Sequence, residues 1–194
     1  EEAFKRRGED LTSKIALNAY DKNEFEVGLQ NLDQTVEAHT QLTMGADSPR
    51  AQELADVHKK QAKSTAIIKT LEVLTASGDV RKAKEIAQGY EASLTSKDRA
   101  TAYKLLEEGK KKRDYDTAKA EGDRLWDVLG NDESAAAAAI AKLTTDGQLA
   151  RDIQANYSAR VAIEKRAAEK QRKDTFGDVQ SSIIKTGRFT TEDR

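Results

Sequence analysis

The two histidines are the side chains of this sequence best suited to acid–base chemistry or metal binding near neutral pH. His39 and His58 fall in different predicted helices, and the chain contains no cysteine. Neither the HExxH spacing of a zinc-binding helix nor a mixed Cys/His ligand set therefore occurs. A serine nucleophile would need a strained turn such as GxSxG, and the sequence has none. We predict no catalytic residue, no metal site, no cofactor and no small-molecule substrate.

Charged residues are abundant but balanced, with 33 Lys and Arg against 34 Asp and Glu. A glycosidase-like pair of carboxylates would need one acid in an apolar pocket, whereas every acid here lies at a helix cap or in a polar helical context. The segments EEGKKKRDYD (107–116) and EKRAAEKQRKD (164–174) mix both signs, as solvated helices with i,i+4 ion pairs do.

The alternative for these two segments is contact with DNA phosphates. The cations concerned would be Lys110, Lys111, Lys112 and Arg113 in the first segment, and Lys165, Arg166, Lys170, Arg172 and Lys173 in the second. Acidic neighbours interrupt both runs, and no aromatic stacking platform accompanies them. We therefore expect no DNA contact.

Two glycine-containing segments, GDVRKAKE and GNDESAAA, need to be separated from phosphate-binding loops. Each has a single glycine and no preceding strand, so neither fits GxxxxGK[ST] or GxGxxG. Both are typical of a turn between helices, in which Gly78 or Gly130 ends one helix and Asp79 caps the helix that follows Gly78.

The composition predicts the elements that these turns connect. With 37% hydrophobic, 35% charged and only 5% aromatic residues, the chain is typical of a helix-rich protein with thin cores. The one proline, Pro49, follows Ser48, a plausible N-cap, and proline is tolerated at the first helical position. From there an apolar stripe is expected along the helix to Ser77, formed by Leu54, Val57, Ala62, Thr65, Ile68, Leu71 and Leu74.

Helix breaks are expected near residues 23, 78, 130 and 187, each between a long helix and a shorter one. The shorter helix after the first break would carry Phe25, Leu29, Leu32 and Val36. We predict an all-α fold, built as an elongated array of helical hairpins with approximate units 1–46, 47–94, 95–145 and 146–194. An irregular helical bundle is the alternative. Leu74 and Ile86 are expected in the core.

Trp126 is the largest apolar side chain and is expected to pack at the turn before Asn131. Tryptophan is also favoured at the centre of interfaces, so Trp126 is a candidate interaction anchor. The run Ala135 to Ala139 would permit the close approach of another helix.

No apolar run is long enough to cross a bilayer, and the N-terminus lacks the pattern of a signal peptide. The sequence does not begin with Met. We expect a helical region, residues 1–194, taken from a longer protein.

The segments LTASGDVRKAKEIAQGYEASLTSKDRATAYKLLEEGKKKRD, AKAEGDRLWDVLGND and AAIAKLTTDGQLARDIQANYSARVAIEKRAAEKQRKDTFGDVQSSIIKTG resemble a helical region of large virion proteins of tailed phages and prophages. The earlier stretch NEFEVGLQNLDQTVEAHTQL fits the same region, although TTDGQLARD lacks the proline found there in related segments. The resemblance implies a tail-associated or internal, ejected virion protein, made in the bacterial cytoplasm, and it brings no catalytic residue.

Two functions are therefore open. In the first, the chain is a structural and assembly component of a virion that binds copies of itself or other virion proteins. In the second, it is a cytoplasmic helical-repeat adaptor for protein or peptide partners, although its repeat spacing is far from the 34 residues of tetratricopeptide repeats.

Overall fold

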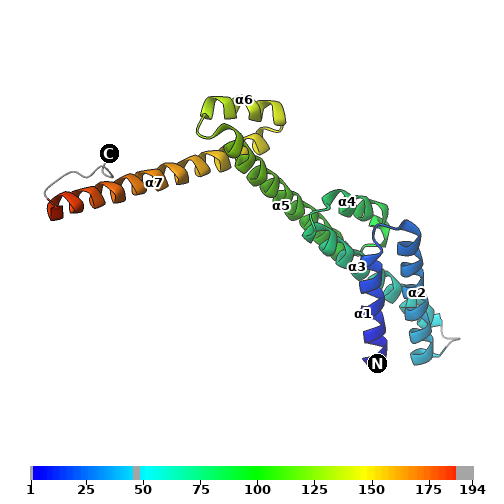
Figure 1. The fold of residues 1–194 in the computed structure, drawn as a ribbon. Helices are drawn as coiled ribbons and strands as arrows, with labels where there is room; N and C mark the ends of the chain where they lie inside the picture. Colours follow the sequence, from blue (N-terminus) through cyan, green and yellow to red (C-terminus); the bar gives the residue numbers. More distant parts are fainter. Residues whose placement is uncertain (1, 46–48, 187–194) are drawn as a thin grey trace. The chain divides into compact units, whose positions relative to one another are not determined.

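The computed structural model describes residues 2–45 and 49–186, and within them the chain is all α, as the sequence predicts (Figure 1). The helices are α1 (Glu2–Leu17), α2 (Lys22–Met44), α3 (Pro49–Ala76), α4 (Val80–Gly89), the 3-10 turn η1 (Glu91–Ser93), α5 (Ser96–Leu129), α6 (Glu133–Leu143) and α7 (Gly147–Thr186). None of these helices is both long enough and apolar enough to cross a membrane.

The chain divides into two compact units, unit 1 (Glu1–Arg113) and unit 2 (Asp114–Arg194). Helix α5 contributes its first part to unit 1 and its last part to unit 2. The predicted breaks at 78 and 130 coincide with the ends of α3 and α5, and the break predicted at Gly187 lies outside the described residues.

Helix α3 is the centre of unit 1, because α1, α2, α4 and η1 all contact it. Its residues Ile67 and Leu71 are fully buried, and Leu74 is nearly so. The other buried members of this core are Ile15, Ala19, Phe25, Leu29, Leu32, Ala66, Ala83, Ile86, Ala87, Leu94 and Ala102. The predicted core positions Leu74 and Ile86 are therefore confirmed.

The apolar stripe predicted for α3 is only partly right. Val57 is 60% exposed and Thr65 is exposed, whereas Ala55 and Ala66 are buried. The reason is that several helices contact α3 from different sides, so its buried residues do not follow a single stripe.

The prediction of a short helix after the first break was wrong. Helix α2 has 23 residues and α1 has 16. The buried residues of α2 recur at helical spacing from Phe25 through Leu29, Leu32 and Val36 to Thr40. Between Gly28 and Gly45 the sequence contains no glycine that would interrupt the helix. The apolar pattern therefore continues past Val36, and α2 is longer than α1 instead of shorter.

Unit 2 has a smaller core, formed by the end of α5, by α6 and by the first half of α7. Its buried residues are Ala118, Leu125, Ala136, Ile140, Ile153, Tyr157 and Val161. A β-carbon added at Gly122 of α5 would lie 2.8 Å from Cβ of Asn156 in α7, so the two helices cross at a glycine. Beyond Val161, none of the residues 162–185 of α7 is buried.

Candidate functional site

The predicted turn at residues 78 and 79 has a structural role. Gly78 has a φ of +86°, a backbone conformation that favours glycine, directly after α3. The carboxylate of Asp79 accepts a hydrogen bond from the backbone N–H of Lys82 at 3.0 Å and caps α4. It also accepts one from the hydroxyl of Tyr20 at 3.1 Å. The bond from Lys82 is the main reason that the pKa of Asp79 lies below its usual value.

The second predicted turn is also structural. Gly130 has a φ of +60°, and its carbonyl accepts a hydrogen bond from the hydroxyl of Tyr157 at 2.8 Å. Trp126 is half-buried against the core of unit 2, with its ring centroid 6.4 Å from that of Tyr157. Burial raises the pKa of Tyr157.

The cap predicted at Ser48 lies outside the described residues, and Pro49 is the first residue of α3.

The two basic segments, 107–116 and 164–174, contain ion pairs between neighbouring acids and bases, as predicted. The Nζ of Lys111 lies 2.8 Å from Glu107, and that of Lys173 lies 2.8 Å from Glu169. Lys112 donates to the carbonyl of Ala76 at 3.2 Å.

Unit 1 contains a groove of about 1260 Å³ bounded by α1, α2 and α3. Its apolar lining includes Leu32 and Val36 of α2 and Ile68 of α3. The remaining lining residues are mostly polar: Glu2, Lys5, Glu9, Thr12, Ser13, Thr35, His39, Thr40, His58, Gln61, Thr65, Lys69 and Glu72, together with Phe4, Gly8 and Ala62. An apolar floor between polar edges suits the apolar face of a protein partner.

Both histidines line this groove, although they lie on different helices as predicted. The ring of His39 stacks on Phe4 with centroids 3.7 Å apart and an interplanar angle of 14°. His58 is exposed. Within residues 2–45 and 49–186, no group of three or more His, Cys, Asp or Glu side chains is placed to hold a metal ion. The shared groove is a feature that the sequence analysis missed, because only the packing of α1 against α2 and α3 brings these residues together.

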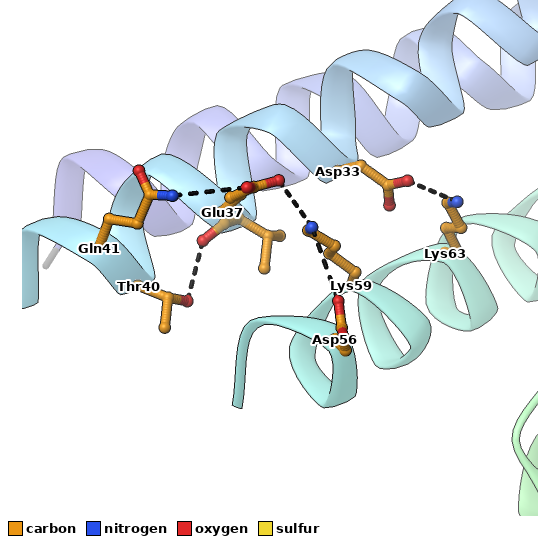
Figure 2. Close-up of polar contacts among 8 residues, drawn as sticks. Asp33, Glu37, Thr40, Gln41, Asp56, Lys59 and Lys63 are labelled. Carbon is orange, nitrogen blue, oxygen red and sulfur yellow. Dashed lines mark hydrogen bonds and ion pairs between the residues drawn. The ribbon is translucent and has the colours of Figure 1, made fainter. Parts of the chain in front are cut away.

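Ion pairs join α2 to α3 (Figure 2). The Nζ of Lys59 lies 2.6 Å from Glu37 and 3.7 Å from Asp56. Its hydrogen bond to Glu37 is the main reason that the pKa of Lys59 is raised. Lys63 pairs with Oδ2 of Asp33 at 2.5 Å.

These pairs lie beside a smaller hollow of about 420 Å³, which Asp33, Asp56, Lys59, Lys60, Lys63, Ala92 and Ser93 line. The Oδ1 atom of Asp33 is buried without a hydrogen-bond partner. Four of the five charged side chains at this hollow, those of Asp33, Asp56, Lys59 and Lys63, are paired to opposite charges, so they form a structural ion-pair network.

Two close contacts position α1 and α2 for the groove. A β-carbon added at Gly28 of α2 would lie 2.6 Å from Cγ1 of Ile15 in α1, so the helices approach closely there. The Phe25 ring lies 5.1 Å from that of Tyr90, which ties the start of α2 to the end of α4. A glycine inside an amphipathic helix, such as Gly28, is a sequence signal that could have indicated this close approach of α1 and α2.

Comparison of the chain with protein-family models, with curated proteins and with solved structures finds no match.

Proposed function

We propose that the chain is a structural and assembly component of a phage or prophage virion, of the tail-associated or internal kind. It acts as a helical scaffold that binds other virion proteins or copies of itself, and it performs no chemistry of its own. The resemblance of its sequence to helical regions of virion proteins provides the setting. The observation that carries the scaffold role is the surface of α7.

Helix α7 is 40 residues long, which corresponds to about 60 Å at ~1.5 Å per residue. Val161 is buried, and none of the residues 162–185 that follow it is. Beyond that point Ile163, Phe176 and Ile184 are 55%, 63% and 84% exposed. Large apolar side chains on a helix that contributes nothing further to its own core are suited to contact with other proteins.

The experiment is mass spectrometry of phage particles purified after induction of the source bacterium. The tryptic peptide DIQANYSAR (residues 152–160) identifies the chain. We expect this peptide at a fixed ratio to the major tail or head proteins. Its absence from particles that are otherwise complete would contradict the virion assignment.

The second candidate function is an intracellular helical adaptor, and the groove of unit 1 favours it. Its apolar floor and polar edges, formed by α1, α2 and α3, could hold a helix of a partner protein. If the peptide is absent from particles, affinity purification of the tagged chain from cell lysate, compared with a variant carrying Thr65→Arg in the groove, becomes the test. Partners lost in the variant would support this second function.

A further inference from the structure

Gly8 lies in the interior of α1, and no contact with another described residue explains why this position is glycine. At Gly28, Gly109 and Gly122, an added β-carbon would lie 2.6 to 2.9 Å from a neighbouring helix. At Gly8 it would meet nothing within 4 Å, and this residue lines the groove. Because glycine weakens a helix relative to alanine, its presence on this face is consistent with the close approach of an external backbone.

Gly177 of α7 is likewise open, but it lines neither hollow of unit 1. It therefore offers a matched comparison: a glycine inside a long helix with equal space around it and no place in the groove.

Charged side chains also lie beside Gly8 on α1. Lys5 and Glu9 lie one helical turn apart on α1, line the groove and are exposed. Among the described residues neither side chain has an ion-pair partner, although the i,i+4 spacing would allow them to pair with each other. An unpaired cation and an unpaired anion on one edge form a surface that is complementary to itself.

Two copies of such a surface can bind each other across a twofold symmetry axis. In a twofold-symmetric contact residue i of one copy faces residue j of the other, and residue j faces residue i. If two α1 helices lie antiparallel across the axis, Lys5 of each copy faces Glu9 of the other. Gly8 then lies close to the axis, where the two backbones approach most closely.

We propose that a second copy of this chain covers the groove, with the two α1 helices antiparallel and in contact near Gly8. The half-buried Phe4, Ala62 and Ile68 would lose their remaining exposure to water in this dimer. This inference rests on the proposed function in one respect: it identifies a second copy of the chain as a partner that the scaffold would bind.

The first experiment is sedimentation velocity of the 194-residue chain from about 1 to 200 μM, the range in which weak dimers dissociate. We expect a concentration-dependent dimer. Lys5→Glu places like charges opposite each other at both symmetric contacts, and so does Glu9→Lys. Each single variant should raise the dissociation constant by about tenfold or more. The double variant Lys5→Glu/Glu9→Lys exchanges the partners and should restore dimerisation.

The second experiment uses the glycines. Gly8→Ala should raise the melting temperature of the monomer, because alanine favours a helix and the space is open. The added methyl group should weaken the dimer, because it separates the two backbones. Gly177→Ala should also stabilise its helix but leave dimerisation unchanged. Circular dichroism of each variant establishes that the helical content is kept.

Two results would overturn the proposal. One is a chain that remains monomeric up to about 200 μM, and the other is a dimer that neither the charge variants nor Gly8→Ala weaken. If the chain is monomeric in solution and its peptide is found in phage particles, the dimer interface is excluded and the virion function is supported. If the chain forms a dimer that the groove variants weaken and its peptide is absent from particles, the dimer interface is supported and the virion function is contradicted.

Discussion

The two units use long helices in different ways. In unit 1 the 28-residue α3 is contacted by α1, α2, α4 and η1, and its buried residues occur from Ala51 to Thr75. In unit 2 the 40-residue α7 is buried only as far as Val161. Helix length therefore does not determine burial; the number of neighbouring helices does. The stability of unit 2 should therefore depend more heavily on each of its few core residues. Substitutions in α7 after Val161 should change that stability little.

Tyr157→Ala should have the largest effect and should be confined to unit 2. The side chain is fully buried, contacts Trp126 and donates to the carbonyl of Gly130. Losing a large aromatic group from a small core should cost about 3–5 kcal/mol. Hydrogen exchange should show lost protection in α6 and the first half of α7, with protection in α2 and α3 retained.

Tyr115→Ala is the control for this variant, because Tyr115 belongs to the same unit and is 60% exposed. Its effect should be small. Equal loss of protection in both units after Tyr157→Ala would show that the two units do not unfold separately.

Gly122→Ala should rank second. The added β-carbon would lie 3.0 Å from the backbone nitrogen of Tyr157, so the helices α5 and α7 must separate. We expect a destabilisation of about 1–3 kcal/mol. Gly177→Ala, in open space, should instead stabilise by about 1 kcal/mol or less. Thermal melts of the two variants should therefore move in opposite directions, and a shift in the same direction would contradict the close helix crossing.

Asp79→Ala tests a cap in unit 1 and should cost about 1 kcal/mol. The pKa of Asp79 is lowered in the folded chain, so its carboxylate contributes stability above the unfolded pKa, and this contribution disappears as pH falls through the folded pKa. The difference in unfolding free energy between wild type and variant should be full at pH 7 and shrink below about pH 4. Urea titrations at several pH values measure it, and a difference independent of pH down to about pH 2 would exclude the ionised cap.

Glu169→Gln should have the smallest effect. It removes the pair with Lys173 on the uncovered part of α7, where both side chains are largely exposed. Pairs of this kind contribute about 0.5 kcal/mol or less, and salt screens them. Chemical denaturation should barely distinguish the variant from wild type. A change above about 1 kcal/mol would mean that this half of α7 is packed in solution.

Local signals in the sequence predicted much of the fold. Gly78 with Asp79, and Gly130, are recognisable because few residues tolerate a positive φ and few side chains cap a helix so well. The all-α class followed from composition and spacing. The length of α2 was missed because its apolar pattern is carried partly by Thr40, a polar residue that is buried with its hydroxyl bonded to the carbonyl of Val36.

The groove could not be predicted from the sequence, because it depends on which helices meet. His39 and His58 approach one hollow only after α2 packs on α3, and the ion pairs of Lys59 and Lys63 that join these helices connect residues more than twenty positions apart. Periodicity finds the face that a helix buries, but not the neighbour that covers it. The packing of Trp126 at the turn before Asn131 was predicted, but its partner Tyr157, 27 positions beyond Gly130 in the sequence, was not.

The start of α5 depends on a residue of α3. Thr95 and Asp98 form a reciprocal cap, and the buried Ser64 accepts from the backbone N–H of Thr95 while donating to Asp98. During synthesis α3 leaves the ribosome before α5, so the hydroxyl that completes this cap is present when the new helix begins. The start of α5 is therefore fixed by a tertiary contact with an earlier helix as well as by its own local cap.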